Sequence, residues 1–141
     1  MTNVVAIQDI RKALNTKKAH LESIYELTEE QDVLIRSLDV VGLMENLNVR
    51  QNHIEAVEEL EKELPDRRTL LLNHDCARLA VEINTILDKI QNLDEHNQQK
   101  ARDCLIFLKG QTKEAADKRR AVTKYNSDAA RTDAVFFDSR K

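Results

Sequence analysis

Apolar residues recur at alternating steps of three and four along the first part of the chain. They form one helical seam: Ile7, Ile10, Leu14, Leu21, Ile24, Ile35 and Leu38. Polar residues also occupy this seam, at Lys17, Thr28 and Gln31. Such spacing is typical of an amphipathic helix and predicts a first helix over residues 4–37. A capping box at residues 28–31 offers a restart of the helix, but the seam keeps its phase there, which favours one continuous helix.

A break in the pattern follows at residues 37–39. Asp39 is a suitable N-cap for a second helix. The apolar positions of that helix keep the same spacing: Val40, Leu43, Leu47, Ile54, Val57 and Leu64. Pro65 disfavours helical geometry at the residue before it, so we expect the second helix to end or kink there. Residues 65–72 then form a candidate short helix with proline at its first position.

A third seam predicts the longest helix. Its apolar positions run through Leu79, Ile83, Ile86, Ile90, Leu93, Ala101, Cys104 and Leu108. Beyond Gly110 the seam thins to Ala115, Val122 and Tyr125. We expect one helix from the caps at residues 73–75 to Lys124 or beyond, a length of about 75 Å. Its distal part is expected to project past the two shorter helices.

The predicted fold is therefore all-α. We expect an elongated antiparallel bundle of three long helices over residues 1–125, followed by a short amphipathic C-terminal segment, residues 126–141. Composition supports this class, because the 141 residues include only 2 Gly and 1 Pro. β-Sandwiches, barrels and dinucleotide-binding folds need turn residues far more often.

The charge pattern limits the partners that we expect. The net charge is −3, which does not indicate a nucleic-acid-binding protein, and the short cluster Lys118-Arg119-Arg120 is weak support for one. Residues 22–66 carry 13 acidic and 3 basic residues, whereas residues 109–141 carry 9 basic and 5 acidic residues. Solvated helix faces account for this segregation, and so do docking surfaces that steer partners.

Catalytic and metal-binding motifs are absent from the sequence. None of the four histidines has a glutamate three residues before it, and two glycines cannot build a phosphate loop. Cys76 and Cys104 lie too far apart on one predicted helix to form a disulfide, so we expect reduced thiols in a cytoplasmic protein. No signal peptide or membrane span is expected either. We expect no enzyme activity, no metal and no cofactor.

The C-terminal segment holds Phe136 and Phe137, two of the three phenylalanines in the chain, directly after Val135. Aromatic side chains left free near a chain end invite aggregation. Two interpretations remain open. The rings fold back on the bundle or on an oligomer mate, or they anchor a partner protein.

Several segments carry a resemblance to a known family. They are residues 21–31 (LESIYELTEEQ), Leu38-Asp39 before a Glu-rich helix, residues 90–99 (IQNLDEHNQQ), and Lys124-Tyr125-Asn126 followed by an ending FFDSRK. With these segments the chain resembles the FlgN family of flagellar type III export chaperones over nearly its whole length. The Leu-Asn-x-x-Asn run of that family stands here as residues 93–97, with Asp94 in place of the first Asn.

The resemblance implies a non-enzymatic chaperone in the bacterial cytoplasm. Such a protein binds hook–filament junction (hook-associated) proteins, prevents their premature polymerisation and delivers them to the export gate. It implies client binding by Val122, Val135, Phe136 and Phe137, and a gate contact by Tyr125, for which ordinary packing at the seam is the alternative. A three-helix arrangement would offer its open groove to an amphipathic client helix.

Two other functions remain open at this point. The first is a structural coiled-coil module that only oligomerises. The chain itself we expect to be a monomer or a weak homodimer. The second is a related chaperone for the filament cap protein, which would share the fold. The Phe pair and the projecting distal helix favour a chaperone over a purely structural rod.

Overall fold

A computed structural model describes the backbone of residues 2–108 and 114–138 and the side chains of residues 7–107 and 117–131. The described chain is all-α and contains no strand, as predicted. It forms five helices: α1 (Thr2–Arg36), α2 (Val40–Glu61), α3 (Arg67–Leu70), α4 (His74–Leu108) and α5 (Glu114–Asp138).

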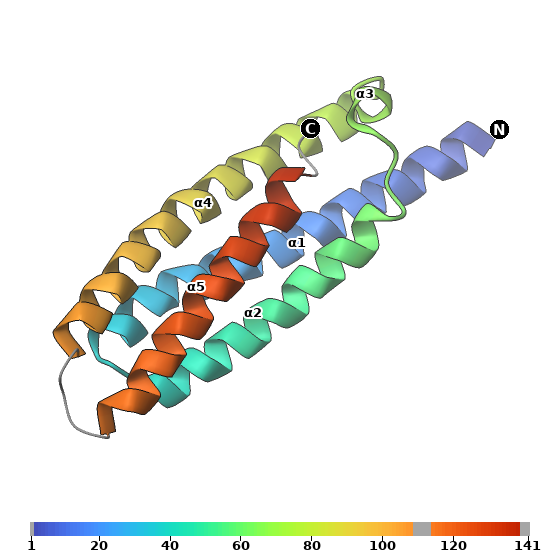
Figure 1. Cartoon of the computed structure of the whole chain (residues 1–141). Helices are drawn as coiled ribbons and strands as arrows, with labels where there is room; N and C mark the ends of the chain where they lie inside the picture. Colours follow the sequence, from blue (N-terminus) through green and yellow to red (C-terminus); the bar gives the residue numbers. More distant parts are fainter. Residues whose placement is uncertain (1, 109–113, 139–141) are drawn as a thin grey trace.

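Four long helices pack in a ring (Figure 1). α1 contacts α2 and α4, and α5 contacts the same two helices from the other side, so α1 and α5 are diagonal, as are α2 and α4. α1 and α4 run in one direction, whereas α2 and α5 run in the other. The segment that contains α3 crosses one end of the bundle and connects the diagonal pair α2 and α4.

The prediction of a single third helix reaching Lys124 is wrong. α4 ends at Leu108, and α5 begins at Glu114 and doubles back along α4 (Figure 1). Gly110 falls in the segment between them, and glycine is a poor helix former. The reversal also buries Ala121, Val122 and Tyr125 in the core, which a projecting helix would leave in water. The expected open groove is therefore filled by α5.

The break between the first two helices lies where the sequence places it. Leu38 adopts a left-handed conformation, with φ of 55°. Its N–H donates to the Ile35 carbonyl at 3.1 Å, and the Asp39 N–H donates to the Leu34 carbonyl at 3.0 Å. This bond pair is the Schellman motif that ends many helices. Asp39 then caps α2, because its carboxylate accepts from the Gly42 N–H at 2.9 Å.

The second predicted break is also present. α2 ends at Glu61, a few residues before Pro65, and the short helix expected in residues 65–72 is α3. Asp66 caps α3 by accepting from the Thr69 N–H at 2.8 Å. The boundary predicted between residues 125 and 126 falls inside α5, which continues through it to Asp138.

The buried apolar residues form two clusters along the bundle. The cluster nearer α3 contains Leu14, Leu21, Ile24, Ile54, Val57, Cys76, Leu79, Ile83, Leu87 and Ile90. The cluster nearer the α1–α2 turn contains Ile35, Leu43, Leu47, Ala101, Ala121, Val122, Tyr125 and Ala129. Polar residues separate the two clusters.

Candidate functional site

A buried polar layer crosses the middle of the bundle. Each of its seven side chains is at most 5% exposed, and all four long helices contribute: Thr28 and Gln31 from α1, Asn46 and Arg50 from α2, Asp94 and Asn97 from α4, and Tyr125 from α5. Thr28 and Gln31 are two of the three polar residues that interrupt the first seam in the sequence. Here they face the core rather than solvent.

Arg50 and Asp94 form an ion pair at the centre of this layer. The Nη2 of Arg50 donates to both carboxylate oxygens of Asp94 at 2.9 Å, and its Nε donates to the Thr28 hydroxyl at 3.1 Å. The Thr28 hydroxyl in turn donates to the Ile24 carbonyl at 2.6 Å. Removing two charges from water is costly, and this hydrogen bonding offsets that cost.

Amide side chains extend the layer along α1. Gln31 donates to the Asn46 Oδ1 at 2.8 Å, and Asn46 donates to the Leu27 carbonyl at 2.9 Å. Asn97 of α4 donates to the Thr28 carbonyl at 2.8 Å. Because each bond needs one alignment of two helices, the layer fixes the register of α1 against α2 and α4.

Tyr125 links α5 to the same layer. Its side chain is 0% exposed, and its hydroxyl donates to the Asp94 Oδ1 at 3.5 Å. Burial raises the pKa of the Tyr125 phenol, and the negative charge of Asp94 raises it further. Val122, one turn earlier, is buried as well. Tyr125, which the resemblance assigns to the gate contact, and Val122, which it assigns to client binding, therefore both face the core in this structure.

The other three residues assigned to client binding lie outside the described side chains. They are Val135, Phe136 and Phe137, in the last part of α5. The backbone of that part lies at the α3 end of the bundle (Figure 1). An ion pair between Arg131 of α5 and Glu58 of α2, at 3.4 Å, holds the helix along α2 as it approaches this end.

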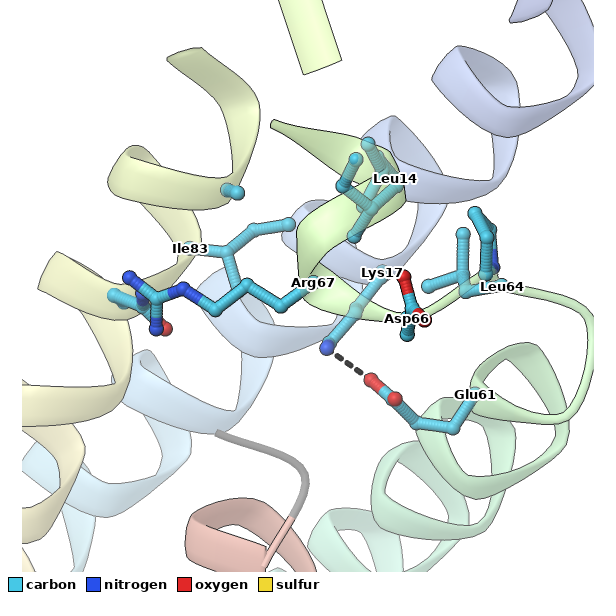
Figure 2. Close-up of a pocket in the computed structure, with 11 residues that line it drawn as sticks. Leu14, Lys17, Glu61, Leu64, Asp66, Arg67 and Ile83 are labelled. Atoms are coloured by element: carbon cyan, nitrogen blue, oxygen red, sulfur yellow. Dashed lines mark hydrogen bonds and ion pairs between the residues drawn. The ribbon is translucent and has the colours of Figure 1, made fainter. Parts of the chain in front are cut away.

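A pocket of about 260 Å³ opens at the α3 end (Figure 2). It is lined by Leu14, Lys17, Glu61, Leu64, Pro65, Asp66, Arg67, Leu70, Ala80, Ile83 and Asn84. Lys17 pairs with Glu61 on one side of it. Figure 2 shows the Arg67 side chain extending across the pocket toward α4. The lining is both apolar and charged, and among the described residues the Arg67 guanidinium has no ion-pair partner.

Candidate metal and thiol chemistry is limited in the described part of the chain. It contains no group of three or more His, Cys, Asp or Glu side chains that could hold a metal ion. Cys76 and Cys104 are free thiols, and burial raises the pKa of both. None of the described helices is both long and apolar enough to cross a lipid bilayer.

The sequence pattern assigns neither Arg50 nor Asp94 to a buried site. The signal was nevertheless present, because both stand at core positions of their helices and carry opposite charges. Asp94 also stands where the FlgN family, which the sequence resembles, has the first Asn of its Leu-Asn-x-x-Asn run. Comparisons of the chain with protein-family models, with curated proteins and with solved structures give no match.

Proposed function

We propose that this chain is a bacterial flagellar export chaperone that works in the cytoplasm. It binds the hook–filament junction proteins, keeps them from polymerising early and delivers them to the type III export gate. The sequence resemblance supports this proposal. The structural observation that carries it is the shared location of the end of α5 and the open pocket beside α3.

The pocket supplies the chemistry for an amphipathic client helix. Leu64, Pro65 and Leu70, which are half-buried, offer an apolar surface to its hydrophobic face, and Arg67 offers a cation to an acidic residue beside that face. Val135, Phe136 and Phe137 then cover the helix from the end of α5. Burial of these three side chains contributes roughly 4–8 kcal/mol before the cost of ordering the segment, which suits a complex that must later release its client.

Calorimetric titration of the full chain against peptides from the terminal helices of a junction protein tests this proposal. We expect binding, and we expect the double variant Phe136→Ala/Phe137→Ala to bind about thirtyfold more weakly, a loss of about 2 kcal/mol. Phe107→Ala is the matched control, because Phe107 is 70% exposed at the opposite end of the bundle. Its affinity should equal that of the wild type.

Melting of the same variants separates binding from packing. If the double variant melts at a lower temperature but binds the peptides as tightly as the wild type, the C-terminal segment is a structural clasp and the assignment of client binding is wrong. The gate contact assigned to Tyr125 requires α5 to leave the core, because this fully buried side chain cannot otherwise reach a partner.

Exposed apolar side chains favour a second candidate, an oligomerisation module. Val33, Val41, Ile106 and Phe107 are each more than half exposed, and all lie close to the helix ends at the α1–α2 turn. Sedimentation equilibrium separates the two functions, because the chaperone is expected to be a monomer or a weak homodimer and the module a stable oligomer. Peptides from the filament cap protein, titrated in parallel, test the related chaperone function.

A further inference from the structure

His20 of α1 and His53 of α2 meet in the groove between these two helices. Their Nδ1 atoms are 2.9 Å apart, and their ring centroids are 5.2 Å apart with an interplanar angle of 54°. Both residues are half-buried. At this distance one Nδ1 must carry the proton and the other must accept it, because a neutral imidazole has one donor nitrogen and one acceptor nitrogen.

We propose that this histidine pair is a pH-sensitive contact between α1 and α2. The contact holds while one Nδ1 donates its proton to the other, and it breaks when both rings become positively charged. Protonation of the accepting Nδ1 turns that nitrogen into a donor. Two N–H groups then face each other, and two positive rings occupy the same site. The rings must turn apart, and the groove between α1 and α2 loses the contact.

The surroundings of His53 give the direction of the effect. Partial burial lowers the pKa of His53, and the positive charge of His20 lowers it further. The unfolded chain, in which this pKa takes its ordinary value of about 6.5, therefore binds a proton before the folded chain does. The free energy of unfolding must fall as the pH drops below about 6.5.

Other charged groups near the pair are already engaged with one another. These contacts are Lys17 with Glu61, Lys18 with Glu22 and with Glu82 of α4, Arg50 with Asp94 of α4, and Arg131 of α5 with Glu58. In the described part of the chain, no carboxylate lies within ion-pair distance of either ring of the pair. The second proton therefore meets repulsion from the first without a compensating anion.

Urea unfolding of the full chain between pH 5 and pH 8, with a chelator present throughout, tests the proposal. We expect the wild-type equilibrium constant for folding to fall below pH 6.5, with the pair contributing up to tenfold per pH unit. His53→Gln should remove the dependence that comes from the pair, whereas His20→Gln should remove only the part caused by the charge of His20, because the burial of His53 remains. The double variant should remove no more than His53→Gln. His74→Gln is the control, because His74 is exposed at the start of α4.

A spectroscopic measurement on the wild type keeps the proposal testable if a variant fails to fold. NMR titration of the ring protons should show the pair taking up protons in two separated steps, one of them well below the ordinary histidine range. Amide exchange around residues 20 and 53 should increase at pH 5.5 relative to pH 7.5. Independent titration of both rings, or variants that follow the wild-type pH dependence, would overturn the proposal. Loss of the contact on addition of the chelator would also overturn the proposal, because a bound metal would then hold the two rings together.

Discussion

The guanidinium of Arg50 lies 2.9 Å from both carboxylate oxygens of Asp94, and each side chain is only 1% exposed. These residues belong to α2 and α4, the diagonal helices that do not pack directly against each other. The ion pair thus spans the centre of the bundle and connects helices that apolar packing leaves apart. Such a pair adds little net stability compared with an apolar replacement, but it penalises any register in which either charge lacks its partner.

Removal of one member of the pair should be more damaging than removal of both. Asp94→Leu leaves a buried guanidinium without its carboxylate, and we expect the free energy of unfolding to fall by about 3–5 kcal/mol. Arg50→Met/Asp94→Leu removes both charges and should cost less than either single change. Urea unfolding of the two single variants and the double variant measures the coupling. Losses that simply add would mean that the two charges do not stabilise each other.

Tyr125 should make the protein sensitive to alkali. Because burial and Asp94 raise the pKa of Tyr125 in the folded chain, the unfolded chain loses the phenolic proton first, from about pH 10. Stability is therefore full below pH 10 and falls above it, by up to about 1.4 kcal/mol per pH unit for this one proton.

Tyr125→Phe should lack this alkaline loss and cost about 1 kcal/mol at neutral pH through its missing hydrogen bond. Equilibrium unfolding between pH 8 and pH 11 measures both effects. Tyr25→Phe is the control, because Tyr25 is only half-buried. An alkaline loss that persists in Tyr125→Phe would assign the effect to another group.

Gly42 should resist a substitution that favours most helices. Alanine gains about 1 kcal/mol over glycine in a helix interior. At Gly42, however, a Cβ would lie 2.5 Å from the Asp39 Oδ2 and 2.9 Å from the Leu34 Cδ2. Gly42→Ala must therefore displace the carboxylate that caps α2, and we expect a net loss of stability.

A double-mutant cycle isolates the cause. In an Asp39→Ala background the cap is already lost, at a cost of about 1 kcal/mol, and the carboxylate no longer obstructs the new methyl group. Gly42→Ala should be less harmful there than in the wild type, or stabilising. Equal effects in the two backgrounds would exclude the capping carboxylate as the obstacle.

The two thiols should react slowly and in a fixed order. Burial raises the pKa of both, so little reactive thiolate is present at neutral pH. Cys76 is 2% exposed, whereas Cys104 is half-buried. We expect a colorimetric thiol reagent to modify Cys104 before Cys76 in the folded chain and both rapidly in urea. Fast modification of Cys76 would indicate that the first turn of α4 opens.

The sequence predicted the apolar core well, because a helical seam depends only on local spacing. Leu14, Leu21 and Ile24 are buried as the pattern requires, and the caps at Asp39 and Asp66 need only neighbouring residues. The reversal between α4 and α5 was missed for a related reason. Ala115, Val122 and Tyr125 continue the seam past Gly110 with little change of spacing, so the pattern is the same for one long helix and for two.

The polar layer could be predicted only in part. Thr28 and Gln31 are visible as interruptions of a seam, but the pattern of a single helix does not say whether such residues face water or a partner in the core. Arg50 and Asp94 are 44 positions apart in the chain, and their pairing depends on the diagonal placement of α2 and α4. The His20–His53 contact likewise depends on how α1 and α2 align.

The order of the helices along the chain sets the order in which the bundle can be completed during synthesis. α1 and α2 are joined by a tight turn and can pair as soon as both have left the ribosome, whereas the α2–α5 contact must wait for the last part of the chain. Pairing of distant segments slows closure, because a large loop must be ordered before any contact is gained. Until α5 packs, Leu43, Leu47 and Ala101 are not buried against it. A nascent or partly folded chain therefore exposes an apolar surface that is buried in the folded protein.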